Sequence, residues 1–416
     1  MMSKKTAIIM ILTVFLGALV ALIWFYFNNN SSGVPNKTTS STSTDIYDPF
    51  GTKSYDSNST STVPLEMESF FGRSDFISTN KLQKISTEPV SGFILSQNKD
   101  GKTNVHYILR SNGNIYENYE ESTESKRLSN TTVPKVYESF WLSGGNKLII
   151  RYLRDKTESV QTFSVKINPA TSTLNEFEGG IDGNFLPEDI TTLAVNPAGD
   201  KIFYLTANLK GSSGFVSKPD GLNKKLLFES PLLEWTSSWP KEEIITLTTK
   251  PAASIPGYLY FLNNTTGNFS KIIGNILGLT TKTNSQATEV LYSDSSRNLP
   301  RLFLLIIKNG ERRPLPWNTL PEKCVWSNTD NKIVYCAVPK SFEAGNYPDL
   351  WYQGLTNFTD DIWMVNTSTG ASTLIYDIQK ETQNKIDAID LQLDKKDNYL
   401  FFINKTDLSL WSLKLK

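Results

Sequence analysis

The chain has 416 residues, beyond the size at which one hydrophobic core keeps growing, so it must divide into domains or repeat a smaller unit. Its 42 Lys and Arg residues balance its 42 Asp and Glu residues, which leaves no net field to attract nucleic acid, and nucleic-acid binding is disfavoured. Aromatic residues make up 12% of the chain, and frequent Gly and Pro favour many short strands joined by tight turns.

An uncharged apolar segment of 21 residues, 7–27, lies close to the N-terminus. As a helix it would be roughly 30 Å long, which matches the hydrocarbon thickness of a bilayer. Lys4 and Lys5 precede it, and four aromatic residues stand at its far end, where an interfacial belt belongs. The positive-inside rule therefore predicts cytoplasmic residues 1–6, a transmembrane helix and an extracytoplasmic remainder.

A cleaved signal peptide is the alternative interpretation of this segment. Its apolar region would be shorter and would end in a small-residue cleavage site, whereas this segment has spanning length and ends in bulky aromatic side chains. No cysteine directly follows the segment to carry a lipid. We therefore expect a single-pass protein of the cell membrane with an uncleaved anchor.

Residues 28–65 are dominated by Ser, Thr and Asn. Such a segment holds too little apolar surface to offset the entropy of ordering, which predicts a flexible linker. The exception is the stretch DIYDPFG at residues 45–51, whose Ile, Tyr and Phe form either a short docking motif or only an aromatic interruption. The linker would tether the following domain to the membrane.

Repeated strand–turn–strand units begin after residue 90 and predict the fold. In each unit an apolar run ends in a polar turn, and a second apolar run follows. The apolar residues before the seven turns are Leu95, Leu142, Val195, Trp235, Leu279, Trp326 and Leu393. Their spacings of 47, 53, 40, 44, 47 and 67 residues suit four-stranded blades, except for the long last one. The pattern predicts an all-β, seven-bladed β-propeller over residues 66–416, with six or eight blades as alternatives.

The two ends of the repeat region complement each other. The last unit contains three strands and lacks a fourth, whereas KLQKIS at residues 81–86 has the pattern of a fourth strand and belongs to no unit. Pairing of these two would close the ring and cover an exposed edge. We therefore expect the N-terminal strand to complete the last blade.

The units NPAGDKIFYL, SNTDNKIVYC and SGGNKLIIRY, with the turns KPDG and TSTG, resemble the TolB-like and WD-repeat-like β-propellers of bacterial envelope proteins. The resemblance covers residues 81–416. These motifs are specific to a fold and not to an activity. The resemblance implies extracytoplasmic protein–protein binding.

Catalytic constellations are missing from the sequence. The one histidine, His106, has no histidine partner for a metal site and is interpreted as a packed or edge residue. Asp360 and Asp361 are adjacent in a predicted strand, so they should point to opposite faces and are interpreted as solvated. We therefore expect no catalytic residue, metal or cofactor. Three acidic residues that could supply calcium ligands are interpreted as turn formers: Asp182, Asp394 and Asp397.

The two cysteines, Cys324 and Cys336, lie symmetrically about Asp330. If the turn centres there, they face each other across two antiparallel strands. A disulfide, which an extracytoplasmic location would allow, and two buried thiols are both compatible with this spacing. In either case their role is structural.

The 67-residue spacing reflects an insert at residues 339–360 in the sixth unit. Aromatic side chains on a loop over a rigid scaffold are typical binding anchors, whereas a loop this long also needs a core of its own. The insert is thus either a binding loop or a cap that packs inward. The candidate binding residues are Tyr347, Trp351, Tyr352 and Phe358.

These observations predict an interaction or scaffold module of the cell envelope that binds a protein or peptide and has no enzymatic activity. The alternative is a propeller that binds carbohydrate or cleaves glycosides, with Trp351 and Tyr352 beside carboxylates around a sugar. A third hypothesis is an assembly component of a surface machine that uses the DIYDPFG stretch as its contact.

Overall fold

The computed structural model describes residues 81–120, 122, 124–142, 144–154, 159–168 and 179–416. The predicted cytoplasmic N-terminus, transmembrane helix and linker lie outside these residues, as does the start of the predicted propeller domain. Within the described residues no helix has the length and apolar character needed to cross a membrane.

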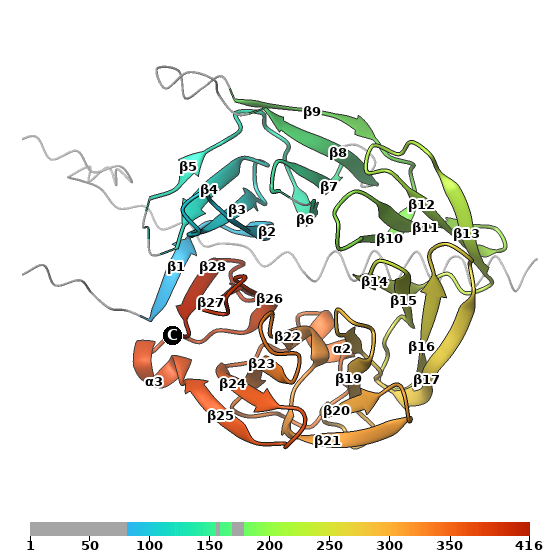
Figure 1. Cartoon of the computed structure of the whole chain (residues 1–416), viewed down its shortest axis with the longest axis vertical. Helices are drawn as coiled ribbons and strands as arrows, with labels where there is room; N and C mark the ends of the chain where they lie inside the picture. Colours follow the sequence, from blue (N-terminus) through green and yellow to red (C-terminus); the bar gives the residue numbers. More distant parts are fainter. Residues whose placement is uncertain (1–80, 121, 123, 143, 155–158, 169–178) are drawn as a thin grey trace, which may run out of the picture. The chain divides into compact units, whose positions relative to one another are not determined.

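Seven four-stranded antiparallel sheets, the blades, follow one another around a ring (Figure 1). In order from the centre outwards, blades 1 to 4 are β2 (Val90–Gln97), β3 (Thr103–Leu109), β4 (Ile115–Tyr119), β5 (Lys126–Arg127); β6 (Val136–Trp141), β7 (Lys147–Leu153), β8 (Val160–Asn168), β9 (Gly180–Phe185); β10 (Ile190–Val195), β11 (Ile202–Asn208), β12 (Gly211–Ser217), β13 (Lys225–Ser230); and β14 (Trp235–Lys241), β15 (Ile244–Thr249), β16 (Pro256–Asn263), β17 (Phe269–Leu277).

Blades 5 to 7 complete the ring. They are β18 (Thr281–Thr283), β19 (Glu289–Asp294), β20 (Arg301–Ile306), β21 (Glu311–Asn318); β22 (Cys324–Trp326), β23 (Ile333–Pro339), β24 (Asp360–Asn366), β25 (Ser372–Tyr376); and β26 (Ala388–Leu393), β27 (Tyr399–Asn404), β28 (Leu410–Lys414), β1 (Leu82–Ser86). Within the described residues three short helices connect strands: η1 (Pro321–Lys323), α2 (Asp349–Tyr352) and α3 (Ile378–Thr382). The all-β fold with seven blades is thereby confirmed.

The ring closes through its N-terminal strand. β1 pairs antiparallel with β28, with Leu82 opposite Leu413 and Lys84 opposite Trp411. A further backbone bond joins the amide of Val90 to the carbonyl oxygen of Leu408 at 2.9 Å. This is the pairing that the unmatched fourth-strand pattern at the N-terminus predicts, and it covers the outer edge of β28.

Hydrophobic cores lie between neighbouring blades. Because side chains alternate along a strand, each blade has two faces, and both must be covered by the next blades of the ring. Seven buried clusters correspond to the seven blade–blade contacts. The contact between blades 7 and 1, for example, buries Ile85, Phe93 and Phe401.

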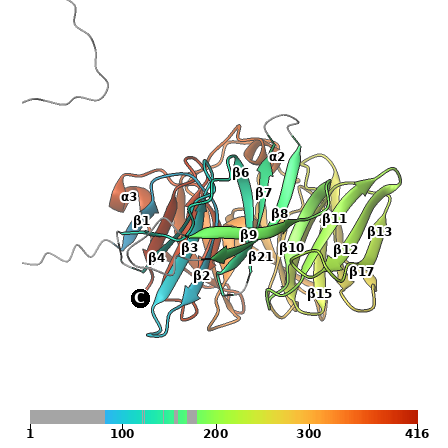
Figure 2. The same cartoon turned by 90° about the horizontal axis from the view of Figure 1, so that it is seen from above.

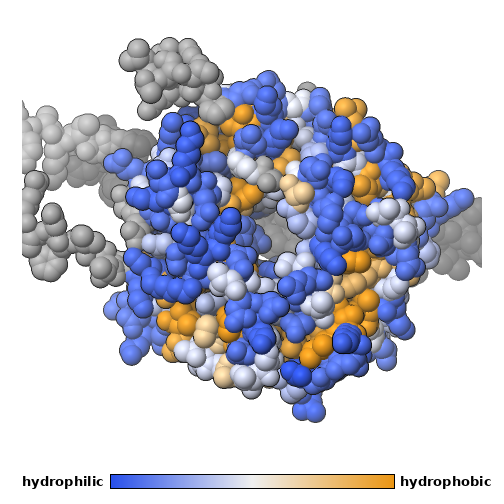
Figure 3. Space-filling model, in the orientation of Figure 1, coloured by the Kyte–Doolittle hydropathy of each residue, from blue (hydrophilic) through white to orange (hydrophobic). Residues whose placement is uncertain are grey.

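The propeller has two different faces (Figure 2). The turns between the first and second strands of each blade lie on what we call the hairpin face. The links between blades and the connections from second to third strands lie on the opposite side, the insert face, which carries α2. Figure 3 looks onto the hairpin face and shows hydrophilic side chains around the central opening, with apolar patches between them.

The closing strand provides a test of how much the ring depends on it. Ile85 is 7% exposed and sits in the cluster between blades 7 and 1, so we expect Ile85→Ala to lower the free energy of unfolding by about 2 to 5 kcal/mol. Lys84→Ala, on the exposed side of the same strand, should cost under about 1 kcal/mol. Urea unfolding followed by tryptophan fluorescence measures both. Equal, small losses would mean that the strand is dispensable.

Candidate functional site

The insert of blade 6, residues 340–359, folds back onto the propeller. Tyr347, Trp351 and Phe358 are only 1%, 4% and 5% exposed, and they form a separate core with Leu320. The rings of Trp351 and Phe358 stack with an interplanar angle of 16°. Three of the four predicted binding anchors therefore pack inward, as the capping alternative has it, because a loop of this length needs a core of its own. Tyr352 alone of the four remains accessible, at 46%.

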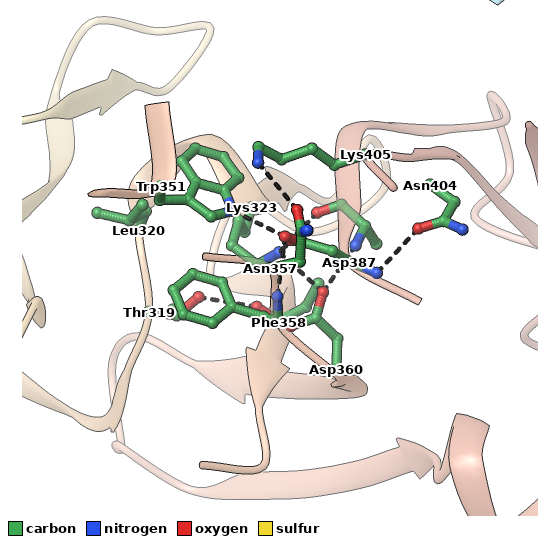
Figure 4. A network of polar contacts seen from close by, with 12 residues as sticks. Thr319, Leu320, Lys323, Trp351, Asn357, Phe358, Asp360, Asp387, Asn404 and Lys405 are labelled. Carbon is green, nitrogen blue, oxygen red and sulfur yellow. Dashed lines mark hydrogen bonds and ion pairs between the residues drawn. The ribbon is translucent and has the colours of Figure 1, made fainter. Parts of the chain in front are cut away.

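A buried lysine fixes the base of this insert (Figure 4). Lys323, the last residue of η1, has a fully buried side chain whose ammonium contacts the carboxylates of Asp360 and Asp387. The Nζ–Oδ2 distance to Asp360 is 2.8 Å, and Nζ also donates to the carbonyl oxygen of Ala388 at 3.0 Å. All three hydrogens of the ammonium thus have acceptors, which offsets the cost of removing the charge from water.

The carboxylate of Asp387 connects the lysine to the insert. Its Oδ2 accepts hydrogen bonds from Nε1 of Trp351 at 2.8 Å and from the backbone amide of Phe358 at 3.0 Å. Lys323 and Lys405 lie over the ring of Trp351, at 5.4 and 5.2 Å from its centroid, a distance at which cations are attracted to an aromatic face. Trp351 is therefore a structural residue that joins the insert to blades 6 and 7.

Asp360 is the less well compensated of the two carboxylates, since one ammonium faces both of them. Its Oδ2 accepts from Lys323 and from the amide of Ala388, whereas Oδ1 has no hydrogen-bond partner among the described residues. Burial raises the pKa of Asp360 to about 7; the ammonium of Lys323 lowers it and the carboxylate of Asp387 raises it further. Near neutral pH the cluster therefore exchanges a proton.

The interpretation of Asp360 and Asp361 as solvated residues is wrong. Asp360 is fully buried and Asp361 is 9% exposed. They do point to opposite faces of β24: Asp360 contacts Lys323, whereas Asp361 forms an ion pair of 2.9 Å with Lys340. The two lysines could not be identified from local patterns, because Lys323 lies 37 residues before Asp360 and Lys340 belongs to the insert.

Cys324 and Cys336 form a disulfide. They occupy directly opposite positions in β22 and β23, so the register centred on Asp330 places them together. Cys324 follows Lys323 in the chain, and the bridge therefore holds the strands next to the buried charge cluster.

A second group of charges lines the central channel on the insert face. Tyr352 donates a hydrogen bond to Oε1 of Glu322, and Lys282 on the inner strand β18 interacts electrostatically with Glu322 and Asp390. Desolvation by the blades packed around them raises the pKa of Glu322 and of Asp390, and it lowers the pKa of Lys282. The side chain of Asp390 nevertheless remains exposed, and Glu322 and Lys282 are half-buried. Glu138 belongs to the same group, with its carboxylate 2.8 Å from Arg151 and a raised pKa due first to burial.

We call Glu138, Lys282, Glu322, Tyr352 and Asp390 the channel mouth. These residues come from four different blades and from the insert. Ionisable groups that interact with one another and whose pKa values are shifted often mark binding sites. Sequence reasoning missed all but Tyr352, although Asp390 interrupts an apolar inner strand and Glu322 directly precedes one.

The other predicted residues have structural roles. His106 contacts the carbonyl oxygen of Gly145 at 2.9 Å and the carboxylate of Glu117 at 3.1 Å, as expected for a packed residue. Asp394 and Asp397 accept hydrogen bonds from backbone amides of turns. Within the described part of the chain, no three His, Cys, Asp or Glu side chains are grouped so that they could hold a metal.

No protein-family model and no curated protein sequence matches the chain. Similar solved structures include an oligogalacturonate lyase from Vibrio parahaemolyticus, with a TM-score of 0.52 and 9% identity over 80% of this chain and 93% of that one. A Niastella koreensis GH74 enzyme gives 0.51 and 13% over 80% and 53%. TolB from Acinetobacter baumannii gives 0.41 and 10% over 77% and 78%. At these identities the similarity shows the fold alone. The β-propeller that the repeats predict is confirmed by the seven four-stranded sheets of the structure.

The raised pKa of Asp360 makes one contribution to stability depend on pH. The folded state binds a proton more tightly than the unfolded state, whose pKa is near 3.8, so this contribution is present at acid pH and is lost as pH rises through about 7. Asp360→Asn removes the titration. We expect the variant to gain stability relative to wild type between about pH 4 and pH 7, the interval between the unfolded and folded pKa values, as measured by urea unfolding.

Asp100→Asn, in an exposed turn, is the matched control and should follow the wild type at every pH. A constant difference between Asp360→Asn and wild type would show that Asp360 stays ionised throughout.

The disulfide closes a loop with a sequence separation of 12 residues, which corresponds to about 3 kcal/mol of stabilisation in the chain-entropy account. We expect dithiothreitol to lower the melting temperature of the wild type and to leave a Cys324→Ala, Cys336→Ala double variant unchanged. Thermal unfolding by circular dichroism measures both. Equal responses of the two proteins would exclude a stabilising bridge.

Proposed function

We propose that the chain is a membrane-anchored, extracytoplasmic interaction module that binds a protein or peptide through its insert face and carries out no catalysis. The apolar segment 7–27 would be the anchor, and the linker would let the propeller reach its partner. The disulfide between Cys324 and Cys336 supports a location outside the cytoplasm, because such bonds persist in oxidising compartments.

The observation that carries this proposal is the set of exposed apolar side chains at the insert. Tyr352 and Leu355 are 46% and 70% exposed. Ile255, which is 63% exposed, lies in the loop before β16. In the same loop the amide of Ala253 donates a hydrogen bond of 2.6 Å to Oδ2 of Asp349 in the insert. We call Ile255, Tyr352 and Leu355 the apolar rim. A partly apolar rim beside a group of charged side chains has the composition of a protein-binding patch.

The rigid support beneath this rim favours binding over a mobile lid. Trp351, one residue before Tyr352, is tied to Asp387, and Asp387 is tied to Lys323. A side chain held by a buried frame loses little further entropy when a partner arrives, so more of the contact energy contributes to affinity.

The carbohydrate alternative placed Trp351 and nearby carboxylates around a sugar. The ring of Trp351 is buried and Asp360 is fully enclosed, so neither is available to a ligand from solvent. The oligogalacturonate lyase and the GH74 enzyme share the fold and no site that can be transferred to this chain.

A capture experiment tests the proposal with the full-length chain in solubilised membranes. We compare the wild type with Tyr352→Ser, Leu355→Ser, which removes apolar rim surface and leaves the buried frame intact. The matched control, Leu226→Ser, Leu374→Ser, removes side chains that are 49% and 43% exposed on outer strands. We expect a protein captured by wild type and control to be at least tenfold depleted with the rim variant.

The captured protein must then bind the purified chain directly, with the same order of affinities. Capture that is unchanged in the rim variant, while its melting temperature equals that of wild type, would remove the insert face from the function. Trp351 is not a suitable probe, because its replacement would remove one donor to the buried carboxylate of Asp387 and would open a cavity in the core of the insert.

A further inference from the structure

A hollow of about 640 Å³ opens on the hairpin face between blades 2 and 3, away from the insert. Strands β7, β8 and β9 form one wall, and the turns at residues 198–200 and 218–220 of blade 3 form the other. Its volume lies in the range typical of small-ligand sites. Gly183 contributes to the wall, and a Cβ there would lie 1.8 Å from the carbonyl oxygen of Ser164.

Three lysines line this hollow: Lys147, Lys166 and Lys218. Lys147 and Lys166 are directly opposite each other in the antiparallel pair of β7 and β8, so their side chains emerge on the same side. Like charges in this position repel each other. The ion pairs found in the described part of the chain include none of the three.

An acidic residue, Asp182, lies near the pair, but it forms no ion pair with either lysine within the described residues. Asp182 on β9 is opposite Lys166, and its Oδ2 accepts a hydrogen bond of 2.5 Å from the side-chain amide of Asn168. The repulsion between the two lysines is therefore not offset by a close ion pair within the described residues. A negatively charged ligand group placed between the two ammonium groups would form close ionic contacts with both and so reduce their repulsion.

The same hollow also presents acceptors. Asp200 and Asp220 line it, each with one oxygen already used: Oδ1 of Asp200 accepts from Asn196 and Oδ1 of Asp220 accepts from the amide of Leu222. A bare anion would be repelled by these carboxylates. A ligand that combines one acidic group with several hydroxyls would satisfy the lysines through its charge and the aspartates through its hydroxyl hydrogens.

We infer that the hollow between blades 2 and 3 binds an acidic carbohydrate, whose carboxylate lies between Lys147 and Lys166 and whose hydroxyls donate to the aspartates. This site is independent of the insert face, and it would let the propeller hold an anionic glycan while its other face binds a protein.

The test uses the full-length chain in detergent and a matched pair of disaccharides, cellobiouronate and cellobiose, which differ only in a carboxylate. Titration calorimetry should show binding of cellobiouronate, at least tenfold weaker binding of cellobiose, and weaker binding at high salt because the contact is ionic. Inorganic phosphate serves as the bare anion and should bind at least tenfold more weakly than cellobiouronate.

Lys147→Gln and Lys166→Gln should each weaken cellobiouronate binding at least fivefold. Neither should lower the melting temperature, because each removes a repulsion. Lys271→Gln, on an exposed part of β17, is the matched control and should bind like wild type.

Equal binding of cellobiouronate and cellobiose would overturn the role of the lysines. Phosphate binding as tight as that of cellobiouronate would reduce the hollow to a plain anion site and overturn the carbohydrate assignment. Unchanged affinity in both lysine variants would place any bound sugar elsewhere. None of these results affects the capture experiment on the apolar rim, so the two proposals can fail separately.

Discussion

Pairing of β1 with β28 is the constraint on which the rest of the molecule depends. Each blade is a sheet with two apolar faces and can bury them only against its two neighbours, so an open ring would leave a face of blade 1 and a face of blade 7 in water. Pairing β1 with β28 within one blade gives every blade two neighbours. This closure also forms the central channel and places the side chains that line it.

The buried cluster around Lys323 applies the same principle to charge. Two carboxylates and one ammonium are removed from water, and the penalty is tolerable because Trp351, Phe358 and Ala388 donate to the carboxylates. The cluster thereby determines the position of the insert. The insert lacks regular strands of its own and is held to blades 6 and 7 by these hydrogen bonds and ion pairs. Removing one of them would leave a buried charge without a partner. Tyr352 is thereby fixed at the channel mouth.

The two faces of the propeller differ in chemistry for the same topological reason. Long connections emerge on the insert face and bring apolar side chains, whereas the tight turns of the hairpin face bring Lys, Asp and Asn, the residues that turns favour. A scaffold built in this way suits the recognition of two unlike partners at once. The fold alone does not identify a partner, since propellers host many unrelated functions. The two proposals rest instead on the apolar rim and on the lysine-lined hollow.

Much of the fold follows from local patterns in the sequence. The turns, the spacing of the apolar runs, the unmatched strand at residues 81–86 and the facing positions of Cys324 and Cys336 all depend on neighbours along the chain, where alternation and turn chemistry act. The site depends on long-range partners: Lys323 contacts Asp387, which lies 64 residues further along the chain, and Trp351 donates a hydrogen bond to the same carboxylate. The identity of an aromatic or acidic residue does not reveal whether its side chain is buried or exposed. Only the tertiary structure could therefore show that Trp351 and Asp360 belong to the buried frame. The same holds for Tyr352 and Asp390, which face the channel.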